Sequence, residues 1–150
     1  MNGFFMELLE DPETNRIEER EKVLQHIPTL ITEVQNKLLL KPIDMVELEE
    51  AVKKMADEKA PGLDGFKTNF FHACWDWIKE EVLEILEDSR KTCDILKAFN
   101  STFLTLILKE VRANKSGKFF QIALCNVIYK IITKVITNRL RTLIPMLISP

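Results

Sequence analysis

The segment 59-KAPGLDG-65 places a Pro-Gly pair and an Asp-Gly pair within seven residues. Glycine adopts positive φ without steric cost, so both pairs favour tight turns. Patterns typical of amphipathic helices lie on both sides, and Pro61 disfavours helical geometry at Ala60. The sequence therefore predicts two helices joined by a loop of defined backbone shape.

The helix before this loop is expected to begin at Asp44. Asp44, followed three residues later by Glu47, forms an N-terminal capping pattern. The apolar residues that follow recur at i, i+3, i+4 and i+7, which is one face of a helix: Leu48, Ala51, Val52 and Met55. Two earlier segments, 14–26 and 32–40, also have helical patterns.

The helix after the loop is expected to begin at Thr68, whose hydroxyl can cap it. The charged run 79–81 is interpreted as a break into a second helix that lasts to about Asp88. Four large aromatic residues indicate that this region is the centre of the core: Phe70, Phe71, Trp75 and Trp77.

The pattern then changes to two short apolar runs, 101–108 and 119–124, separated by a polar, basic loop. They predict an antiparallel pair of strands with a long connection. Asn126 is expected to cap a final helix over 127–143, with apolar residues along one side. The predicted fold class is α+β, mainly helical, with one short antiparallel β-hairpin.

Composition favours a globular intracellular protein, with 46% apolar and 29% charged residues among 150. No uncharged apolar run reaches the length of a membrane span, and the first residues lack the pattern of a signal peptide. Nucleus and cytoplasm both stay open as locations. Cys74, Cys93 and Cys125 are widely separated, so they are interpreted as structural residues, and no metal site is predicted.

Charge is distributed unevenly along the chain, although the net charge is only −2. Residues 1–65 carry 15 acidic and 8 basic residues, whereas residues 109–150 carry one acidic and eight basic residues. A basic end can bind a polyanion such as nucleic acid, and it can equally be a solvated helix face with a lysine-rich loop.

Three stretches occur in a fixed order: KAPGLDGF, then STFLTLILK, then IALCNVIYKIITKVITNRL. Their succession resembles the front part of the reverse transcriptase of non-LTR (LINE-type) retrotransposons, especially those of plants. The resemblance covers residues 27–150, and it identifies residues 1–26 as a helical lead-in from the region before the polymerase.

The resemblance implies the fingers of a right-hand polymerase, with an RNA template or an RNA/DNA hybrid as partner. By position, it implies that the template-side loop contains Lys59, Gly62, Asp64 and Gly65. It places Lys130 and Arg139 in a nucleic-acid-binding helix, and it places Lys109 against the phosphates of the nucleotide. The glycines would let the loop backbone approach a nucleic-acid strand closely.

The chain departs from the family at one nucleotide-binding position. The family has Phe-Arg-Pro where this chain has Phe119-Phe120-Gln121, so a charged donor is replaced by an apolar ring. The Mg²⁺-binding aspartates of the family lie in the palm, beyond the Ile-Ser-Pro stretch. The resemblance thus implies a partial domain that ends before the palm, with no catalytic residue and no cofactor of its own.

A second reading is a small helical interaction module with no role in nucleic-acid binding. Loss of the palm would then uncover an apolar stripe on the last helix, formed by Ile131, Val135 and Leu143. Such a stripe is expected to favour self-association. No membrane partner is expected on either reading.

Overall fold

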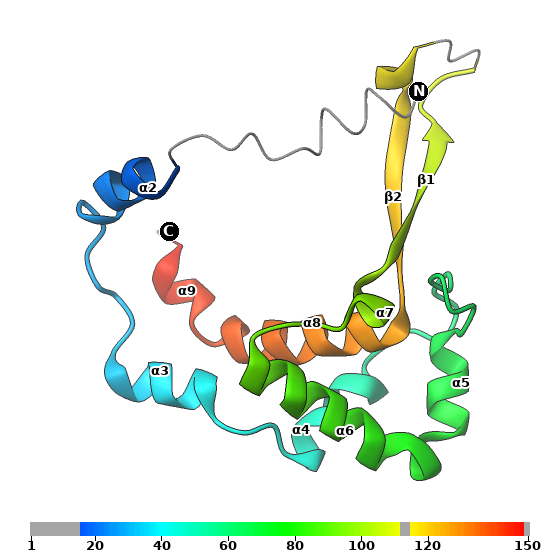
Figure 1. Ribbon diagram of the computed structural model, residues 1–150, viewed down its shortest axis with the longest axis horizontal. Helices are drawn as coiled ribbons and strands as arrows, with labels where there is room; N and C mark the ends of the chain where they lie inside the picture. The colour runs from blue at the N-terminus through cyan, green and yellow to red at the C-terminus, as the bar shows by residue number, and fades with distance from the viewer. Residues whose placement is uncertain (1–15, 112–114, 149–150) are drawn as a thin grey trace.

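The computed structural model describes residues 16–111 and 115–148, and it confirms a mainly helical α+β fold with one antiparallel hairpin (Figure 1). The helices are α2 (Arg16–Leu24), α3 (Glu33–Leu40), α4 (Met45–Lys53), α5 (Thr68–Ala73), α6 (Trp75–Thr92), α7 (Lys97–Asn100), α8 (Val127–Arg141) and α9 (Ile144–Leu147). The strands are β1 (Thr102–Leu108) and β2 (Phe119–Cys125), and a short 3-10 helix (Ser116–Lys118) precedes β2.

The hydrophobic core lies between α4, α5, α6 and α8, and α8 contributes the most buried side chains. Its buried residues are Val127, Ile128, Ile131, Ile132 and Val135. The prediction that the aromatic segment forms the centre of the core is wrong. Phe71 is buried, but Trp77 is 82% exposed and Phe70 is 39% exposed. Leu48 and Ile131, both 0% exposed, mark the centre instead.

The start of α4 agrees with the sequence pattern. The Asp44 carboxylate accepts a hydrogen bond of 2.8 Å from the Glu47 N–H and so caps the helix. The expected cap at Thr68 is wrong, because Lys67 occupies the N-cap position without a side-chain hydrogen bond. Thr68 is 0% exposed, and its hydroxyl has no hydrogen-bond partner among the described residues.

The expected break at residues 79–81 is also wrong. α6 runs through these residues from Trp75 to Thr92, and the chain bends earlier, at Cys74. Lysine and glutamate are good helix formers, so a charged run on the solvent side continues a helix. The helix ends at Thr92, and the next residue, Cys93, adopts a left-handed conformation with φ of 56°.

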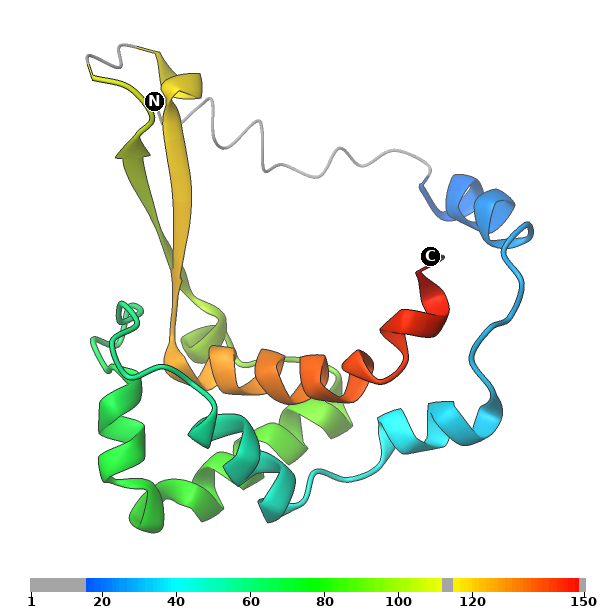
Figure 2. The ribbon, with the colours of Figure 1, turned by 180° about the vertical axis from the view of Figure 1, so that it is seen from behind.

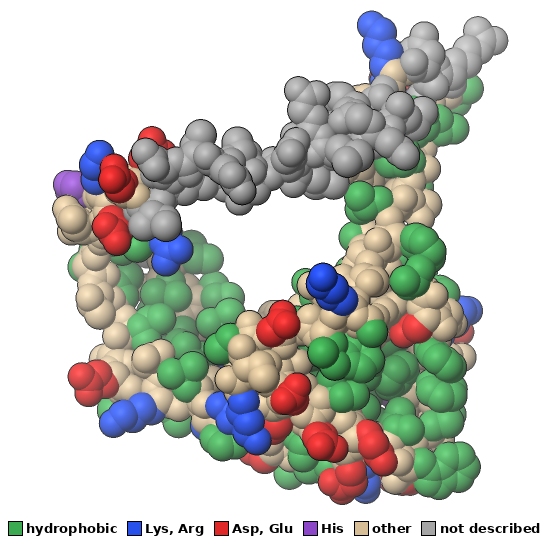
Figure 3. All heavy atoms as spheres, in the orientation of Figure 1, with side chains coloured by type: hydrophobic (Ala, Val, Ile, Leu, Met, Phe, Trp, Pro, Cys, Tyr) green, Lys and Arg blue, Asp and Glu red, His purple; other side chains and the backbone are tan. Residues whose placement is uncertain are grey.

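The two strands form a sheet of their own that projects from the helical body (Figures 1 and 2). Thr102 pairs with Cys125, and Leu108 pairs with Phe119, which confirms the predicted antiparallel pair. Large apolar side chains are exposed on the hairpin, as Figure 3 shows along its length. They include Phe103 (54%), Leu104 (48%), Leu108 (57%) and Phe120 (57%).

The stripe expected to be uncovered on the last helix is not exposed. Ile131, Val135 and Leu143 are 0%, 1% and 8% exposed because they pack into the core of this chain. The exposed apolar side chains of α8 are instead Ile136 (50%) and Leu140 (37%). Within the described ranges, none of the helices is both long enough and apolar enough to cross a membrane.

Candidate nucleic-acid interface

The loop of residues 59–65, here called the turn loop, is attached to the start of α8 through Asn126. The Asn126 Oδ1 accepts a hydrogen bond of 3.3 Å from the Asp64 N–H. The Nδ2 of the same side chain donates to the Ala98 carbonyl of α7 at 2.9 Å. Asn126 is 1% exposed, and although it occupies the N-cap position, its side chain does not cap α8. It connects the turn loop, α7 and α8 instead.

Gly62 makes this attachment possible. An added β-carbon at Gly62 would lie 2.3 Å from the Asn126 Oδ1 and 2.4 Å from the Asn126 backbone nitrogen, which is too close for any side chain. From the sequence, Gly62 was expected to let a nucleic-acid strand approach the loop backbone closely. In the structure, Asn126 occupies the space that a side chain at residue 62 would need.

Hydrogen bonds within the turn loop fix its backbone. The Gly65 N–H donates to the Gly62 carbonyl at 3.3 Å, and Gly65 adopts φ of 76°. The Asp64 carboxylate accepts a hydrogen bond of 3.1 Å from the Phe66 N–H, as is common for aspartate in turns. The Asp64 side chain therefore shapes the loop itself.

Basic side chains of α8 begin beside the turn loop. The Lys130 Nζ donates to the Ala60 carbonyl at 2.9 Å. Lys134 and Arg141 follow Lys130 at i+4 and i+11, so all three share one side of the helix, on which Lys130 and Lys134 are half-buried and Arg141 is exposed. These three residues are here called the basic stripe. Lys59 is exposed at the start of the turn loop, next to the Ala60 carbonyl that Lys130 contacts. The turn loop and the basic stripe are together the candidate surface.

Lys109 lies apart from this surface, at the end of β1. Its Nζ donates to the Gly117 carbonyl at 3.1 Å and lies 5.0 Å from the centre of the Phe120 ring. Phe120 is the residue at which the resemblance implies an arginine in the family. The ring therefore contacts the lysine through a cation–π interaction. Lys109 is exposed and retains donor capacity for another ligand.

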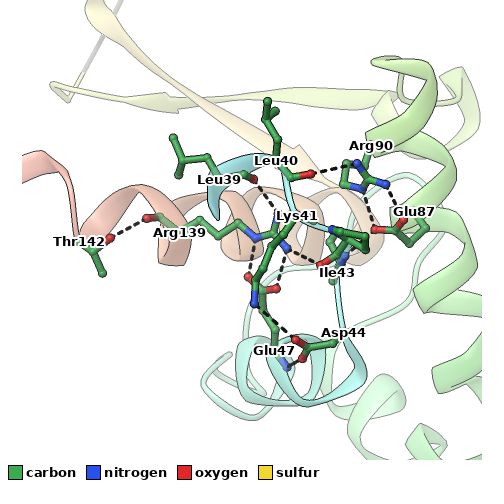
Figure 4. A network of polar contacts seen from close by, with 11 residues as sticks. Leu39, Leu40, Lys41, Ile43, Asp44, Glu47, Glu87, Arg90, Arg139 and Thr142 are labelled. Atoms are coloured by element: carbon green, nitrogen blue, oxygen red, sulfur yellow. Dashed lines mark hydrogen bonds and ion pairs between the residues drawn. The ribbon is translucent and has the colours of Figure 1, made fainter. Parts of the chain in front are cut away.

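Arg139 is placed on another side of α8, where all its N–H donors have partners within the protein (Figure 4). Nε and one terminal nitrogen donate to the two carboxylate oxygens of Glu47, each at 2.7 Å. The remaining hydrogen bonds go to the carbonyls of Leu39, Lys41 and Pro42. The Glu47 carboxylate raises the pKa of Arg139. A nucleic-acid contact by Arg139 would require loss of one of these bonds.

Arg90 of α6 holds the same stretch of chain, residues 39–43, here called the connector (Figure 4). Arg90 donates to the Leu40 carbonyl at 3.2 Å and to both oxygens of Glu87. Glu87 in turn accepts a hydrogen bond of 2.6 Å from the Ile43 N–H. The hydrogen bonds from Arg90 and Ile43 lower the pKa of Glu87 to about 2.

An apolar groove of about 360 Å³ lies beside the connector, between α3, α6 and α8. Leu39, Ile43, Leu86, Ile136 and Leu140 are among its lining residues. No group of three or more His, Cys, Asp or Glu side chains that could hold a metal ion occurs among residues 16–111 and 115–148.

Sequence reasoning missed the two residues that organise this region. Asn126 was predicted to cap a helix. The residue type alone cannot distinguish a side chain that caps a helix from one that connects two segments of the chain. The Arg139–Glu47 pair spans 92 residues, and no local pattern connects two such positions.

Comparison with known proteins provides a relative but no family assignment. No family model matches the chain. The "Transposon TX1 uncharacterized 149 kDa protein" of Xenopus laevis is 27% identical over 121 residues, which cover 81% of this chain. The match covers 9% of that protein, so the chain spans only a small part of its relative. The similarity supports a relation to a protein of a non-LTR retrotransposon.

Proposed function

We propose that this chain is the fingers part of a retrotransposon reverse transcriptase, and that it contacts single-stranded RNA through the turn loop and the basic stripe. The main support is the attachment of the turn loop to the start of α8: Asn126 binds the Asp64 N–H, and Lys130, the first residue of the basic stripe, binds the Ala60 carbonyl beside Lys59. The transposon relative and the order of the three sequence motifs support the same assignment.

The chemistry of this surface suits the phosphate backbone. Lysine offers a mobile point charge and arginine a planar fork of donors, and both bind phosphate oxygens. Contacts of this kind carry no base specificity, so we propose binding that depends strongly on salt and weakly on sequence.

Titration of the purified chain with a fluorescent single-stranded RNA at several salt concentrations tests the proposal. In the Lys134→Gln/Arg141→Gln variant, two phosphate contacts are lost, so the slope of log K against log salt should fall by about 1.4. The matched control Lys79→Gln/Lys91→Gln removes the same charge from α6 and should leave the slope unchanged. Equal slopes in both variants, or no binding at low salt, would reject the interface.

A protein-interaction role is the second candidate, and the exposed apolar side chains of the hairpin favour it. A chain that ignores RNA at low salt but associates with protein would fit this role. The same RNA titration therefore separates the two candidates.

A further inference from the structure

Among residues 16–111 and 115–148, no strand pairs with either outer edge of the β-hairpin, and both edges lack the usual protection against strand pairing. Within the described residues, β1 and β2 pair only with each other. Neither strand contains a charged residue, a proline or a glycine. Natural proteins usually protect a long edge strand with one of these residues or with a bulge. An uncharged seven-residue edge is instead a template for pairing with another strand.

The backbone of β1 shows which of its groups point outward. The Lys109 N–H donates to the Lys118 carbonyl at 2.9 Å, and the register continues from this pair along the ladder. Polar backbone groups alternate between the two edges of a strand. The N–H and C=O groups of Leu104, Leu106 and Leu108 therefore point away from β2, toward the open edge.

The sequence of β1 is complementary to itself in an antiparallel arrangement. With a two-fold axis at Thr105, Phe103 faces Ile107 of the second copy and Leu104 faces Leu106 of the second copy. Thr105 faces Thr105 of the second copy. Aromatic–β-branched pairs and threonine pairs are among the favourable cross-strand pairs. A two-fold axis at Ile122 would pair β2 with β2 of the second copy and place Gln121 opposite Ala123. This cross-strand pair is less favourable than those of β1.

The placement of charge agrees with this arrangement. The antiparallel pairing places Lys109 opposite Ser101 of the second copy, so the lysines of the two copies lie at opposite ends.

We propose that β1 is a self-association edge, and that two copies of this chain pair through it to form a continuous four-stranded antiparallel sheet. The two-fold axis passes through Thr105, and the outward backbone groups of Leu104 and Leu106 form the central hydrogen bonds. This interface uses neither the turn loop nor the basic stripe.

Analytical ultracentrifugation of the full chain over about 1 μM to 1 mM, the range of weak complexes, tests the proposal. The unmodified chain should show a concentration-dependent monomer–dimer equilibrium. Thr105 is exposed, so Thr105→Lys and Thr105→Glu should each fold, as circular dichroism will check. Each variant alone should dimerise at least about fivefold more weakly, because like charges then face each other across the axis.

Mixing the two charged variants provides the decisive measurement. Lysine then faces glutamate across the axis, so the mixture should dimerise more strongly than either variant alone. The control Ala123→Lys adds the same charge to β2 and should leave dimerisation unchanged. A monomeric unmodified chain, a failure of the mixture to restore dimers, or equal weakening by Ala123→Lys would each overturn the proposal.

Discussion

Gly62 and Asn126 lie so close together that a β-carbon on Gly62 would stand 2.4 Å from the Asn126 nitrogen and 2.6 Å from its α-carbon. The obstructing atoms belong to the backbone at the start of α8, so they cannot rotate away as the end of a flexible side chain would. The position of the turn loop therefore depends on the absence of a side chain at residue 62.

Replacing this glycine should destabilise the protein more than replacing its neighbour in the same loop. Gly62→Ala should lower the free energy of unfolding by about 2–3 kcal/mol, because the loop must move away from α8. Gly65→Ala meets no atom within 4 Å but retains φ of 76°, so it should cost only about 1–2 kcal/mol. Urea denaturation measures both, and a larger loss for Gly65→Ala would contradict the packing argument.

Removing the Asn126 side chain should release the turn loop. Asn126→Ala leaves the Asp64 N–H and the Ala98 carbonyl without their partner, at a cost of about 2 kcal/mol. Hydrogen exchange of the Asp64 amide should become faster in this variant. Asn126→Asp retains an acceptor for that amide and should keep most of its protection. Equal exchange of the Asp64 amide in Asn126→Ala and in the unmodified chain would show that the hydrogen bond is not needed.

Lysine should not be able to replace Arg139 without a loss of stability. The Arg139 and Glu47 side chains are 11% and 16% exposed, and a single ammonium group cannot reproduce five hydrogen bonds in fixed directions. Arg139→Lys should lower the free energy of unfolding by about 3 kcal/mol. Arg141→Lys, two residues away on an exposed side, should change it by less than about 0.5 kcal/mol. Thermal denaturation of both variants compares them directly.

Stability should decline in acid as Glu87 is protonated. The pKa of Glu87 is lowered from an ordinary 4.5 to about 2 in the folded chain. A lowered pKa means that the folded state favours the carboxylate, so this stabilisation is complete above pH 4.5 and is lost as the pH falls toward 2.

The Glu87→Gln variant should therefore be less stable at neutral pH and show a flatter acid decline between about pH 4.5 and pH 2. Glu84→Gln removes an exposed carboxylate from the same helix and should retain the steep decline. Denaturant titrations across this window provide the comparison. Parallel pH profiles for the Glu87 variant and the unmodified chain would argue against the assigned role.

The sequence predicted the elements whose signals are local. The Asp44 cap, the stripe of Leu48, Ala51 and Val52, and the two strands all follow from spacing within a few residues, and the structure contains each of them. Errors arose where tertiary packing decides. Trp77 has the residue type of a core residue, yet it lies on the exposed side of α6 because Val82 and Leu86 define the buried side.

The sequence indicated which segments form the candidate site, but it did not indicate the contacts that connect these segments. The turn loop and the α8 lysines were recognisable from glycines and charge, but the partner of Gly62 was not. From the sequence, Lys130 and Arg139 were predicted alike, as basic nucleic-acid-binding residues of one helix. Their surroundings differ because Lys130 reaches the Ala60 carbonyl at the edge of the loop, whereas Arg139 points toward Glu47 and the connector.

The hydrogen bonds from Arg139 to the connector have a consequence for folding on the ribosome. The Arg139–Leu39 hydrogen bond joins residues 100 positions apart, so it cannot form before Arg139 has been synthesised, although Arg90 and Glu87 contact the connector from earlier in the chain. The connector leaves the exit tunnel long before α8 has been synthesised, so α3 and α4 must wait for their final attachment. We expect a nascent chain stalled before residue 139 to be cleaved by protease within residues 39–43, and a chain stalled well after α8 to resist.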